Sequence, residues 1–173
     1  MKMTPIRSSI RCNPSARQSR AVKPRVEVPV FTGQSRILLV DDDHGVRDSL
    51  AGVLMAEGFL VVPAANGAEA LIIAHASPVD MVILDLNMPV KNGWDTFEQL
   101  SAEHPLLPVI IVTARPNQLF TALGAGVGAL LEKPLDIPNL LTTIRRLLKE
   151  SDASHLRRLA GQKTPFHYQA ATR

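Results

Sequence analysis

The 173-residue sequence lacks several features that would assign it to a familiar class. It contains a single cysteine, Cys12, so an internal disulfide is impossible and a reducing compartment is expected. No apolar run approaches the roughly 18 residues of a membrane-spanning helix, and the first residues have no apolar secretory core. The nucleotide-binding patterns G-x-G-x-x-G and G-x-x-x-x-G-K-[ST] are also absent. These absences argue against a secreted disulfide scaffold and a membrane-spanning protein, and they predict a cytoplasmic one.

Charge is divided unevenly along the chain. Residues 1–36 carry eight Lys or Arg and one Glu, and residues 37–150 carry seven Lys or Arg and fourteen Asp or Glu. Residues 151–173 carry four Lys or Arg and one Asp. An acidic body is therefore flanked by two basic segments, and the overall net charge of +3 does not describe the body.

The two ends of the chain are predicted to be tails. Residues 1–35 hold four prolines and scattered basic residues without an apolar period, which predicts a disordered basic tail. This composition is also typical of an organellar transit peptide, and such a tail can bind nucleic acid through counterion release. Residues 151–173 are too short for a DNA-binding output domain. We expect a short solvated tail there, whose first part can extend the last helix.

Between the tails, residues 36–150 alternate between short apolar runs and segments with helical spacing. Continuous apolar runs bounded by turn signals are typical of strands that are buried on both faces. The predicted strands are 36–40, 59–62, 81–85, 108–112 and 127–131. The predicted helices are 44–57, 67–76, one with Trp94, Phe97 and Leu100 at helical spacing, a short one whose apolar residues are Leu119, Phe120 and Leu123, and one that Asp136 caps.

Strict alternation of strands and helices predicts an α/β protein with helices on both faces of a parallel sheet. With five strands, the favoured architecture is a flavodoxin-like (βα)5, doubly wound sheet in the order 2-1-3-4-5.

Polar side chains follow four of the predicted strands at the points where these strands end. They are Asp41, Asp42, Asp43, Asp85, Thr113 and Lys133. The four strands are neighbours in the predicted order, so their carboxyl ends face one pocket. Clustered carboxylates repel each other unless a cation is present, and Mg²⁺ prefers oxygen ligands. A carboxylate beside Mg²⁺ and a lysine ammonium is poised to attack phosphorus, and Asp85 is the predicted nucleophile.

This set of residues resembles the phosphorylation site of the receiver domains of two-component response regulators, the CheY-like family. The resemblance covers residues 36–150. It implies that Asp85 is the phosphoacceptor, that Thr113 is the switch hydroxyl, and that Lys133 pairs with the phosphate. The Lys133–Pro134 bond is a candidate cis peptide.

The resemblance also implies a Mg²⁺ site. Its ligands would be Asp41, Asp42, Asp85 and the backbone carbonyl of Asn87. Asp43 lies outside the matched acidic pair, and we assign it to helix capping.

The implied function is that of a single-domain response regulator. A sensor histidine kinase or phosphotransfer protein would phosphorylate it, and the phosphorylated form would signal to a downstream protein without being an enzyme in its own right. The face formed by the fourth helix, fifth strand and fifth helix often carries dimer or partner contacts in this family. One departure is Leu130, because the family usually has Tyr or Phe three residues before the lysine. The usual threonine–aromatic switch therefore cannot operate unchanged.

Two other functions stay open. The run Asp41-Asp42-Asp43 fits the D-x-D signature of aspartate-based phosphatases, with Asp41 as the nucleophile, although this leaves Asp85 less well explained. The chain could instead be a phosphorylation-independent interaction module whose basic tail binds nucleic acid or an acidic partner.

Overall fold

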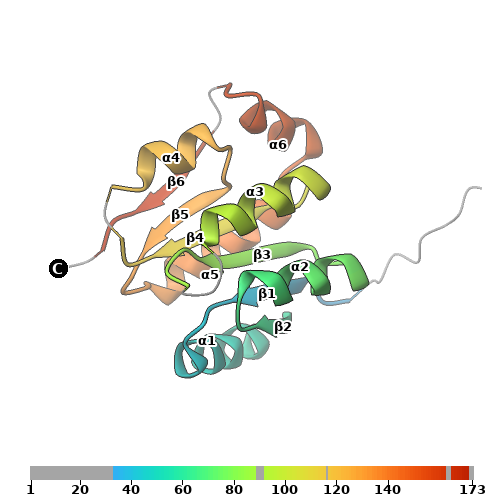
Figure 1. Cartoon of the computed structure of the whole chain (residues 1–173), viewed down its shortest axis with the longest axis vertical. Helices are drawn as coiled ribbons and strands as arrows, with labels where there is room; N and C mark the ends of the chain where they lie inside the picture. The colour runs from blue at the N-terminus through green and yellow to red at the C-terminus, as the bar shows by residue number, and fades with distance from the viewer. Residues whose placement is uncertain (1–32, 89–91, 116, 163–164, 172–173) are drawn as a thin grey trace, which may run out of the picture. The chain divides into compact units, whose positions relative to one another are not determined.

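The computed structural model describes residues 33–88, 92–115, 117–162 and 165–171. Strands and helices alternate through most of this part of the chain (Figure 1). The elements are β1 (Arg36–Val40), α1 (His44–Ala56), β2 (Leu60–Ala64), α2 (Gly67–Ala76), β3 (Met81–Asp85), α3 (Gly93–Glu103), β4 (Val109–Thr113), α4 (Leu119–Gly124), β5 (Ala129–Glu132), α5 (Ile137–Leu148), α6 (Asp152–Leu159) and β6 (His167–Gln169). Nearly all of the predicted N-terminal tail, residues 1–32, lies outside the described residues. None of the helices in the described part is both long and apolar enough to cross a membrane.

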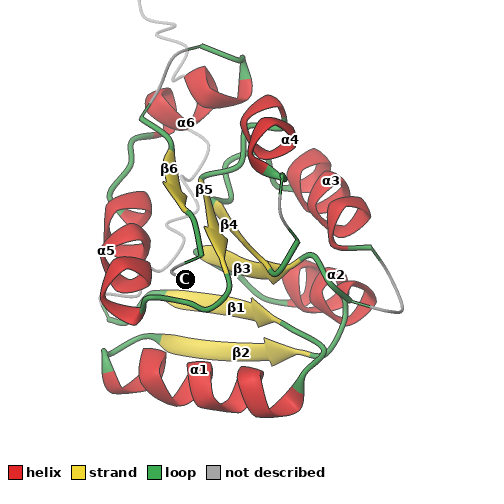
Figure 2. Cartoon of the chain, turned by 90° about the vertical axis from the view of Figure 1, so that its left-hand side faces the viewer, coloured by secondary structure: helices red, strands yellow, loops and turns green. Residues whose placement is uncertain are grey.

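The strands form one parallel sheet in the order β2-β1-β3-β4-β5-β6. The predicted order 2-1-3-4-5 is confirmed, and β6 adds a sixth strand beyond β5. Helices α1 and α5 cover one face of the sheet, and α2, α3 and α4 cover the other (Figure 2).

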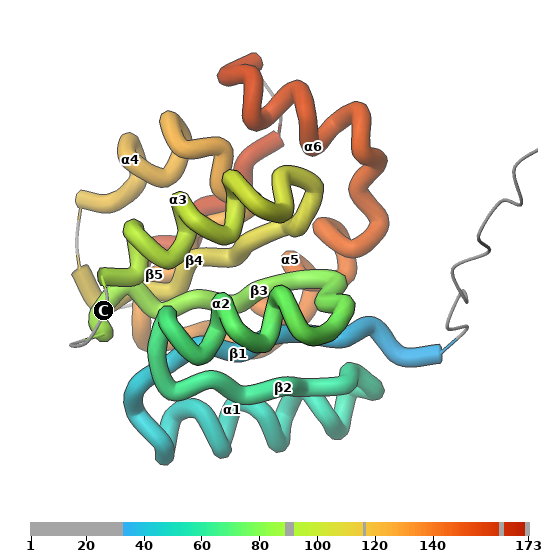
Figure 3. Tube along the Cα trace, turned by 45° about the vertical axis from the view of Figure 1, so that its right-hand side comes forward, coloured from blue at the N-terminus to red at the C-terminus, as the bar shows by residue number. Residues whose placement is uncertain are grey.

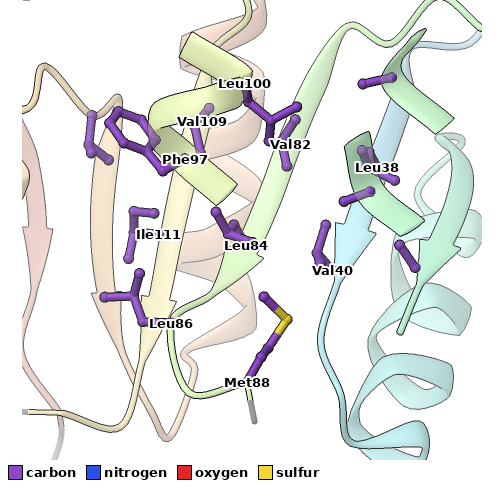
Figure 4. Close-up of a cluster of buried hydrophobic side chains, with 14 of the residues drawn as sticks. Leu38, Val40, Val82, Leu84, Leu86, Met88, Phe97, Leu100, Val109 and Ile111 are labelled. Carbon is purple, nitrogen blue, oxygen red and sulfur yellow. The ribbon is translucent and has the colours of Figure 1, made fainter. Parts of the chain in front are cut away.

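Two apolar cores lie on the two faces of the sheet because successive side chains of a strand point in opposite directions. In β1, Leu38 and Val40 pack toward α2 and α3, whereas Ile37 and Leu39 pack toward α1 and α5. Figure 4 shows the first of these cores, with Phe97 from α3 over the sheet. Burial on both faces explains why β1, β3, β4 and β5 are continuous apolar runs instead of alternating ones.

Side chains cap the helices where the sequence predicted. The Asp43 carboxylate accepts hydrogen bonds from the backbone N–H groups of Gly45 and Val46, at 2.8 and 3.1 Å, at the start of α1. These backbone hydrogen bonds lower the pKa of Asp43. Asn66 and Asp136 cap α2 and α5 in the same way.

The apolar residues of α4 do not all face the core. Phe120 is 84% exposed and Leu123 is 43% exposed, whereas Ala122 is fully buried. A helix of six residues has room for few inward positions, and a small alanine lets it lie close to the sheet.

The C-terminal segment is not the solvated tail that the sequence predicted. Helix α5 ends at Leu148, and the Ser151 hydroxyl caps the separate helix α6. The chain then returns beside β5 as the parallel strand β6 (Figure 2 and Figure 3). In α6, His155 and Arg158 are buried. Burial and the nearby Arg158 guanidinium lower the pKa of His155, which favours its neutral form in the packed helix.

Candidate functional site

The predicted site residues converge at the carboxyl edge of the sheet. Asp41 follows β1, Asp85 ends β3, Thr113 ends β4 and Lys133 follows β5. Because all these strands are parallel, their C-terminal ends lie at the same edge. The buried apolar strands therefore act as supports that hold the polar groups at fixed spacings.

Lys133 joins the two buried carboxylates of the site. Its Nζ lies 2.9 Å from Asp41 Oδ2 and 2.7 Å from Asp85 Oδ2. The two aspartates are only 4% and 3% exposed. Burial by itself lowers the pKa of Lys133, but the hydrogen bonds and charges of Asp85 and Asp41 outweigh burial and raise it. The ammonium therefore keeps its positive charge at neutral pH.

The second oxygen of each buried carboxylate is held by the backbone. Asp41 Oδ1 accepts the N–H of Asp43 at 2.9 Å, and Asp85 Oδ1 accepts the N–H of Asn87 at 2.9 Å. Both carboxylates are thus fixed at two points, with one oxygen toward the loop backbone and the other toward Lys133. Such preorganised groups need little rearrangement when a reactant arrives.

The donor set fits a hard divalent cation. Asp41, Asp42 and Asp85 each offer a carboxylate oxygen, and these atoms lie within 4.8 Å of one another. Three carboxylates and one ammonium leave a formal charge of −3 + 1 = −2, which Mg²⁺ would neutralise. In addition, Asn87 Oδ1 is buried and has no hydrogen-bond partner among the described residues. The role of the Asn87 backbone carbonyl as a ligand stays a prediction.

Thr113 lies at the same edge of the sheet, where its hydroxyl is hydrogen-bonded to the backbone of the following loop. It is fully buried, and its Oγ1 accepts the backbone N–H of Arg115 at 2.9 Å. Its carbonyl oxygen accepts the N–H of Lys133 at 2.8 Å, so the ends of β4 and β5 are joined. Leu130, at the usual aromatic position, is fully buried in the apolar core. The switch role of Thr113 stays a prediction.

Sequence reasoning missed a connection between the loops on either side of the site. Trp94 Nε1, at the start of α3, donates a hydrogen bond to Gln118 Oε1 at 3.0 Å, in the segment that leads from β4 to α4. The Trp94 ring also packs edge-on against Phe97, with 5.8 Å between the ring centroids. The sequence showed Trp94 only as an apolar residue of a helix, because the partner of an indole N–H depends on tertiary structure.

Gly93 lets α3 begin directly against the end of β3, the strand that carries Asp85. A Cβ at this position would lie 2.6 Å from the carbonyl oxygen of Asp85 and 2.6 Å from Leu86 Cα. Both are backbone atoms, so Gly93→Ala is expected to lower the free energy of unfolding by about 1–3 kcal/mol in urea denaturation.

The matched control is Gly52→Ala on the exposed side of α1, where a Cβ would meet nothing within 4 Å. That change is expected to raise stability by about 0.5–1 kcal/mol, because alanine favours helix more than glycine does. Equal effects of the two substitutions would contradict the close approach at Gly93.

The fold and the site define a class: a doubly wound parallel α/β protein with an acidic pocket and a lysine at the carboxyl edge of its sheet. The family model of the response regulator receiver domain matches residues 37–145. The chain belongs to this family, whose members bind Mg²⁺ at an acidic pocket.

Relatives and solved structures agree with this membership. The chain is 42% identical over 119 residues to the transcriptional regulatory protein CpxR of Klebsiella pneumoniae, covering 68% of this chain and 50% of CpxR. It is 40% identical over 119 residues to the response regulator MprA of Mycobacterium sp. (strain KMS), covering 67% and 51%. The chain thus spans about half the length of these relatives.

Two solved structures show the same fold. A CheY-like receiver domain protein from Methanospirillum hungatei superposes with a TM-score of 0.63 at 30% identity, covering 67% of this chain and 94% of that one. The response regulator TrrA of Thermotoga maritima, in complex with Mg²⁺-BeF, gives a TM-score of 0.62 at 27% identity, covering 66% and 99%.

Proposed function

We propose that this receiver domain accepts a phosphoryl group on Asp85 in a Mg²⁺-dependent step and signals through altered contacts with other proteins. The observation that carries the proposal is the pairing of the buried Asp85 and Asp41 carboxylates with the Lys133 ammonium in one pocket. A phosphoryl group is what such a pocket would stabilise once Mg²⁺ is bound, because the ion and the Lys133 ammonium would place positive charge beside the nucleophilic oxygen of Asp85.

In the proposed reaction, an Asp85 carboxylate oxygen attacks the phosphorus of a phosphohistidine on the donor protein. The new P–O bond forms as the P–N bond breaks, and the donor imidazole leaves with the electron pair and takes up a proton. Lys133 moves from the carboxylate to a phosphoryl oxygen. Later attack of water on phosphorus returns the carboxylate and releases inorganic phosphate.

Asp41, Asp42 and Asp85 would hold Mg²⁺. When bound, the ion supplies positive charge that neutralises the phosphoryl oxygens in the transition state. Asp43 N–H and Lys133 fix the Asp41 carboxylate, so this ligand is already oriented. Thr113 is the proposed hydrogen-bond donor to a phosphoryl oxygen, since its hydroxyl proton is not required for the bond that it accepts from Arg115.

The arrangement favours this function over an aspartate-based phosphatase that uses Asp41. In that alternative, the second aspartate of the D-x-D signature, Asp43, would act on the substrate. Here Asp43 is exposed and its carboxylate caps α1. We therefore propose a phosphoacceptor with only its own phosphorylation and dephosphorylation chemistry, and not an enzyme that turns over a substrate.

A protein is the proposed phosphodonor. A groove of about 560 Å³ opens beside Lys133, between the first turns of α1 and the loop from β5 to α5. Its lining is mainly apolar: Gly45, Val46, Ser49, Leu50, Val53, Lys133, Pro134, Leu135 and Ile137. An apolar groove beside Lys133, whose ammonium contacts Asp85, suits a sensor kinase or phosphotransfer protein that presents its phosphohistidine to Asp85.

Val46 offers a test of this donor site, since it is 37% exposed in the groove. Val46→Asp is expected to slow phosphotransfer from a cognate kinase at least about tenfold, because it places a charge in an apolar contact. Labelling by the small donor acetyl phosphate should stay unchanged. If the phosphorylation rate falls equally with the kinase and with acetyl phosphate, the substitution damages the phosphorylation site itself.

The relatives CpxR and MprA are named as regulatory proteins, and the chain matches about half of each. We propose that the described domain acts in the cytoplasm as a response regulator receiver whose phosphorylation changes its contact with a protein partner. The alternative of an interaction module that works without phosphorylation predicts partner affinities that do not change with the state of Asp85.

The proposed function is tested by intact-mass measurement after incubation with acetyl phosphate and Mg²⁺. A gain of one phosphoryl group that hydroxylamine removes, and that chelation of Mg²⁺ prevents, is the expected result. A protein that gains no mass under these conditions would refute the proposal.

A further inference from the structure

The C-terminal segment, residues 151–171 without the undescribed 163–164, is attached to the domain by specific contacts at several places; we call it the cap. The buried guanidinium of Arg158 donates to the carbonyl of Gly126 at 3.1 Å and to the Glu150 carboxylate at 2.6 Å. Gly126 has φ of +74°, and a Cβ there would lie 2.9 Å from Leu159. Helix α6 therefore lies directly on the segment between α4 and β5.

The last part of the cap covers the edge of β5. Leu130 pairs with Tyr168 in the parallel register of β5 and β6. On the α5 side, Asn139 Oδ1 accepts a hydrogen bond from His167 Nε2 at 2.8 Å, and Asn139 Nδ2 donates to Gln169 Oε1 at 2.7 Å. An apolar strand with an open edge invites pairing with other chains, and here a segment of the same chain occupies that edge.

Two contacts of the cap converge on one carboxylate beside the phosphorylation site. The Tyr168 hydroxyl donates to Glu132 Oε1 at 2.8 Å, and the Ala171 N–H donates to Glu132 Oε2 at 3.0 Å. Glu132 directly precedes Lys133, whose ammonium holds Asp85. A single peptide unit thus separates the residue that fastens the cap from the residue that contacts the nucleophile.

We propose that the cap is an intramolecular inhibitor of the β5 edge and that phosphorylation of Asp85 loosens it through Lys133 and Glu132. This inference rests on the proposed function, because it requires a phosphoryl group on Asp85. The β5 edge is occupied by the chain's own C-terminal segment, and releasing that segment would expose this edge.

Phosphorylation is expected to loosen the cap, and not β4, because the contacts around Lys133 are weakest on the side of the cap. A phosphoryl group on Asp85 would add negatively charged oxygens beyond the carboxylate that Lys133 now contacts at 2.7 Å, so the ammonium would move toward them. The backbone N–H of Lys133 is bonded to the carbonyl of the buried Thr113, so β4 resists the displacement on that side. On the other side lies Glu132, which holds a three-residue edge strand and a tyrosine that is 40% exposed. These surface bonds break at lower cost than those of the core.

Coupling between two sites is reciprocal, which makes the inference quantitative. If a phosphoryl group loosens the cap, then loosening the cap must strengthen binding of a phosphoryl analogue by the same factor. Couplings of this kind are typically about fivefold or more.

Hydrogen–deuterium exchange of the full chain tests the inference, with Mg²⁺ and beryllofluoride as the phosphoryl analogue. The amides of residues 167–171 are expected to exchange at least about fivefold faster with the analogue than with Mg²⁺ alone. Intact mass after acetyl phosphate treatment is measured on the same preparation. If the protein is phosphorylated but exchange at residues 167–171 does not change or slows, the inference is overturned and the proposed function stands. If it gains no phosphoryl group, the proposed function itself has failed.

Two variants separate the coupling from simple loosening. Glu132→Gln retains the shape of the side chain and weakens its bonds to Tyr168 and Ala171, so the analogue should no longer accelerate exchange of the cap. Asn139→Ala loosens the cap on the α5 side and leaves Glu132 and Lys133 intact. In the Asn139→Ala protein, the amides of residues 167–171 should exchange faster than in the wild type even without the analogue, and adding the analogue should accelerate them further. This variant should also bind beryllofluoride more tightly than the wild type. A Glu132→Gln protein that responds like the wild type would contradict the route through Glu132.

Discussion

Asp85→Asn is expected to abolish phosphorylation by acetyl phosphate, with the labelling rate falling at least about a hundredfold, to the limit of intact-mass detection. An amide oxygen is a poor nucleophile toward phosphorus, and the substitution also removes one of the three carboxylates that cluster in the site. The fold should survive, because asparagine has nearly the same shape and its amide oxygen can still accept the Asn87 N–H that Asp85 Oδ1 now accepts. Circular dichroism and urea denaturation would verify this.

Asp95→Asn is the matched control for Asp85→Asn. Asp95 lies exposed in the first turn of α3, ten residues from Asp85, and the change removes the same charge. Acetyl phosphate should label the Asp95→Asn protein at the wild-type rate. Full labelling of the Asp85→Asn protein would show that another group accepts the phosphoryl group.

Lys133→Met is expected to produce the second largest effect, on stability and on reactivity together. The buried carboxylates of Asp41 and Asp85 would lose the ammonium that lies 2.9 and 2.7 Å from them. Removing one partner of a buried ionic cluster leaves uncompensated charge, so the free energy of unfolding should fall by about 3 kcal/mol in the presence of a chelator. The labelling rate by acetyl phosphate should fall about a hundredfold, because a cation that stabilises the transition state is gone.

Added Mg²⁺ should raise the thermal midpoint of the Lys133→Met protein more than that of the wild type. The formal charge of the pocket changes from −2 to −3 in the variant, and tighter binding to the folded state gives a larger stabilisation. Lys149→Met, at the exposed C-terminal end of α5, is the control and should leave both quantities unchanged. If Mg²⁺ raises the thermal midpoint of the wild type and of the Lys133→Met protein equally, the metal binds away from Lys133.

The sequence predicted the sheet and the pocket because both depend on signals that are local in the chain. Continuous apolar runs identify buried strands, and the alternation with helices specifies a parallel sheet. Once the strand order is known, residues such as Asp85 and Lys133 must meet at one edge. The prediction that the Lys133–Pro134 bond is cis is also confirmed.

The elements that sequence reasoning missed have no comparable local signal. Strand β6 is His-Tyr-Gln, with one residue of high strand propensity and no apolar run, and its stability comes from pairing with β5 and from Glu132. The burial of Arg158 depends on Glu150 and on the carbonyl of Gly126, 32 residues away. The outward position of Phe120 follows from how α4 lies on the sheet, which an apolar residue at helical spacing does not reveal.

The hydrogen bond between Trp94 and Gln118 has a practical consequence. Trp94 is the single tryptophan of the chain, so its ultraviolet emission would come from one known place. Its indole lies at the start of α3, and its partner lies in the segment that follows Thr113. A rearrangement of either loop would change the polarity around the ring and shift the emission wavelength. The domain thus carries an intrinsic optical reporter, with which a stopped-flow fluorimeter could follow the phosphorylation state of unlabelled protein in real time.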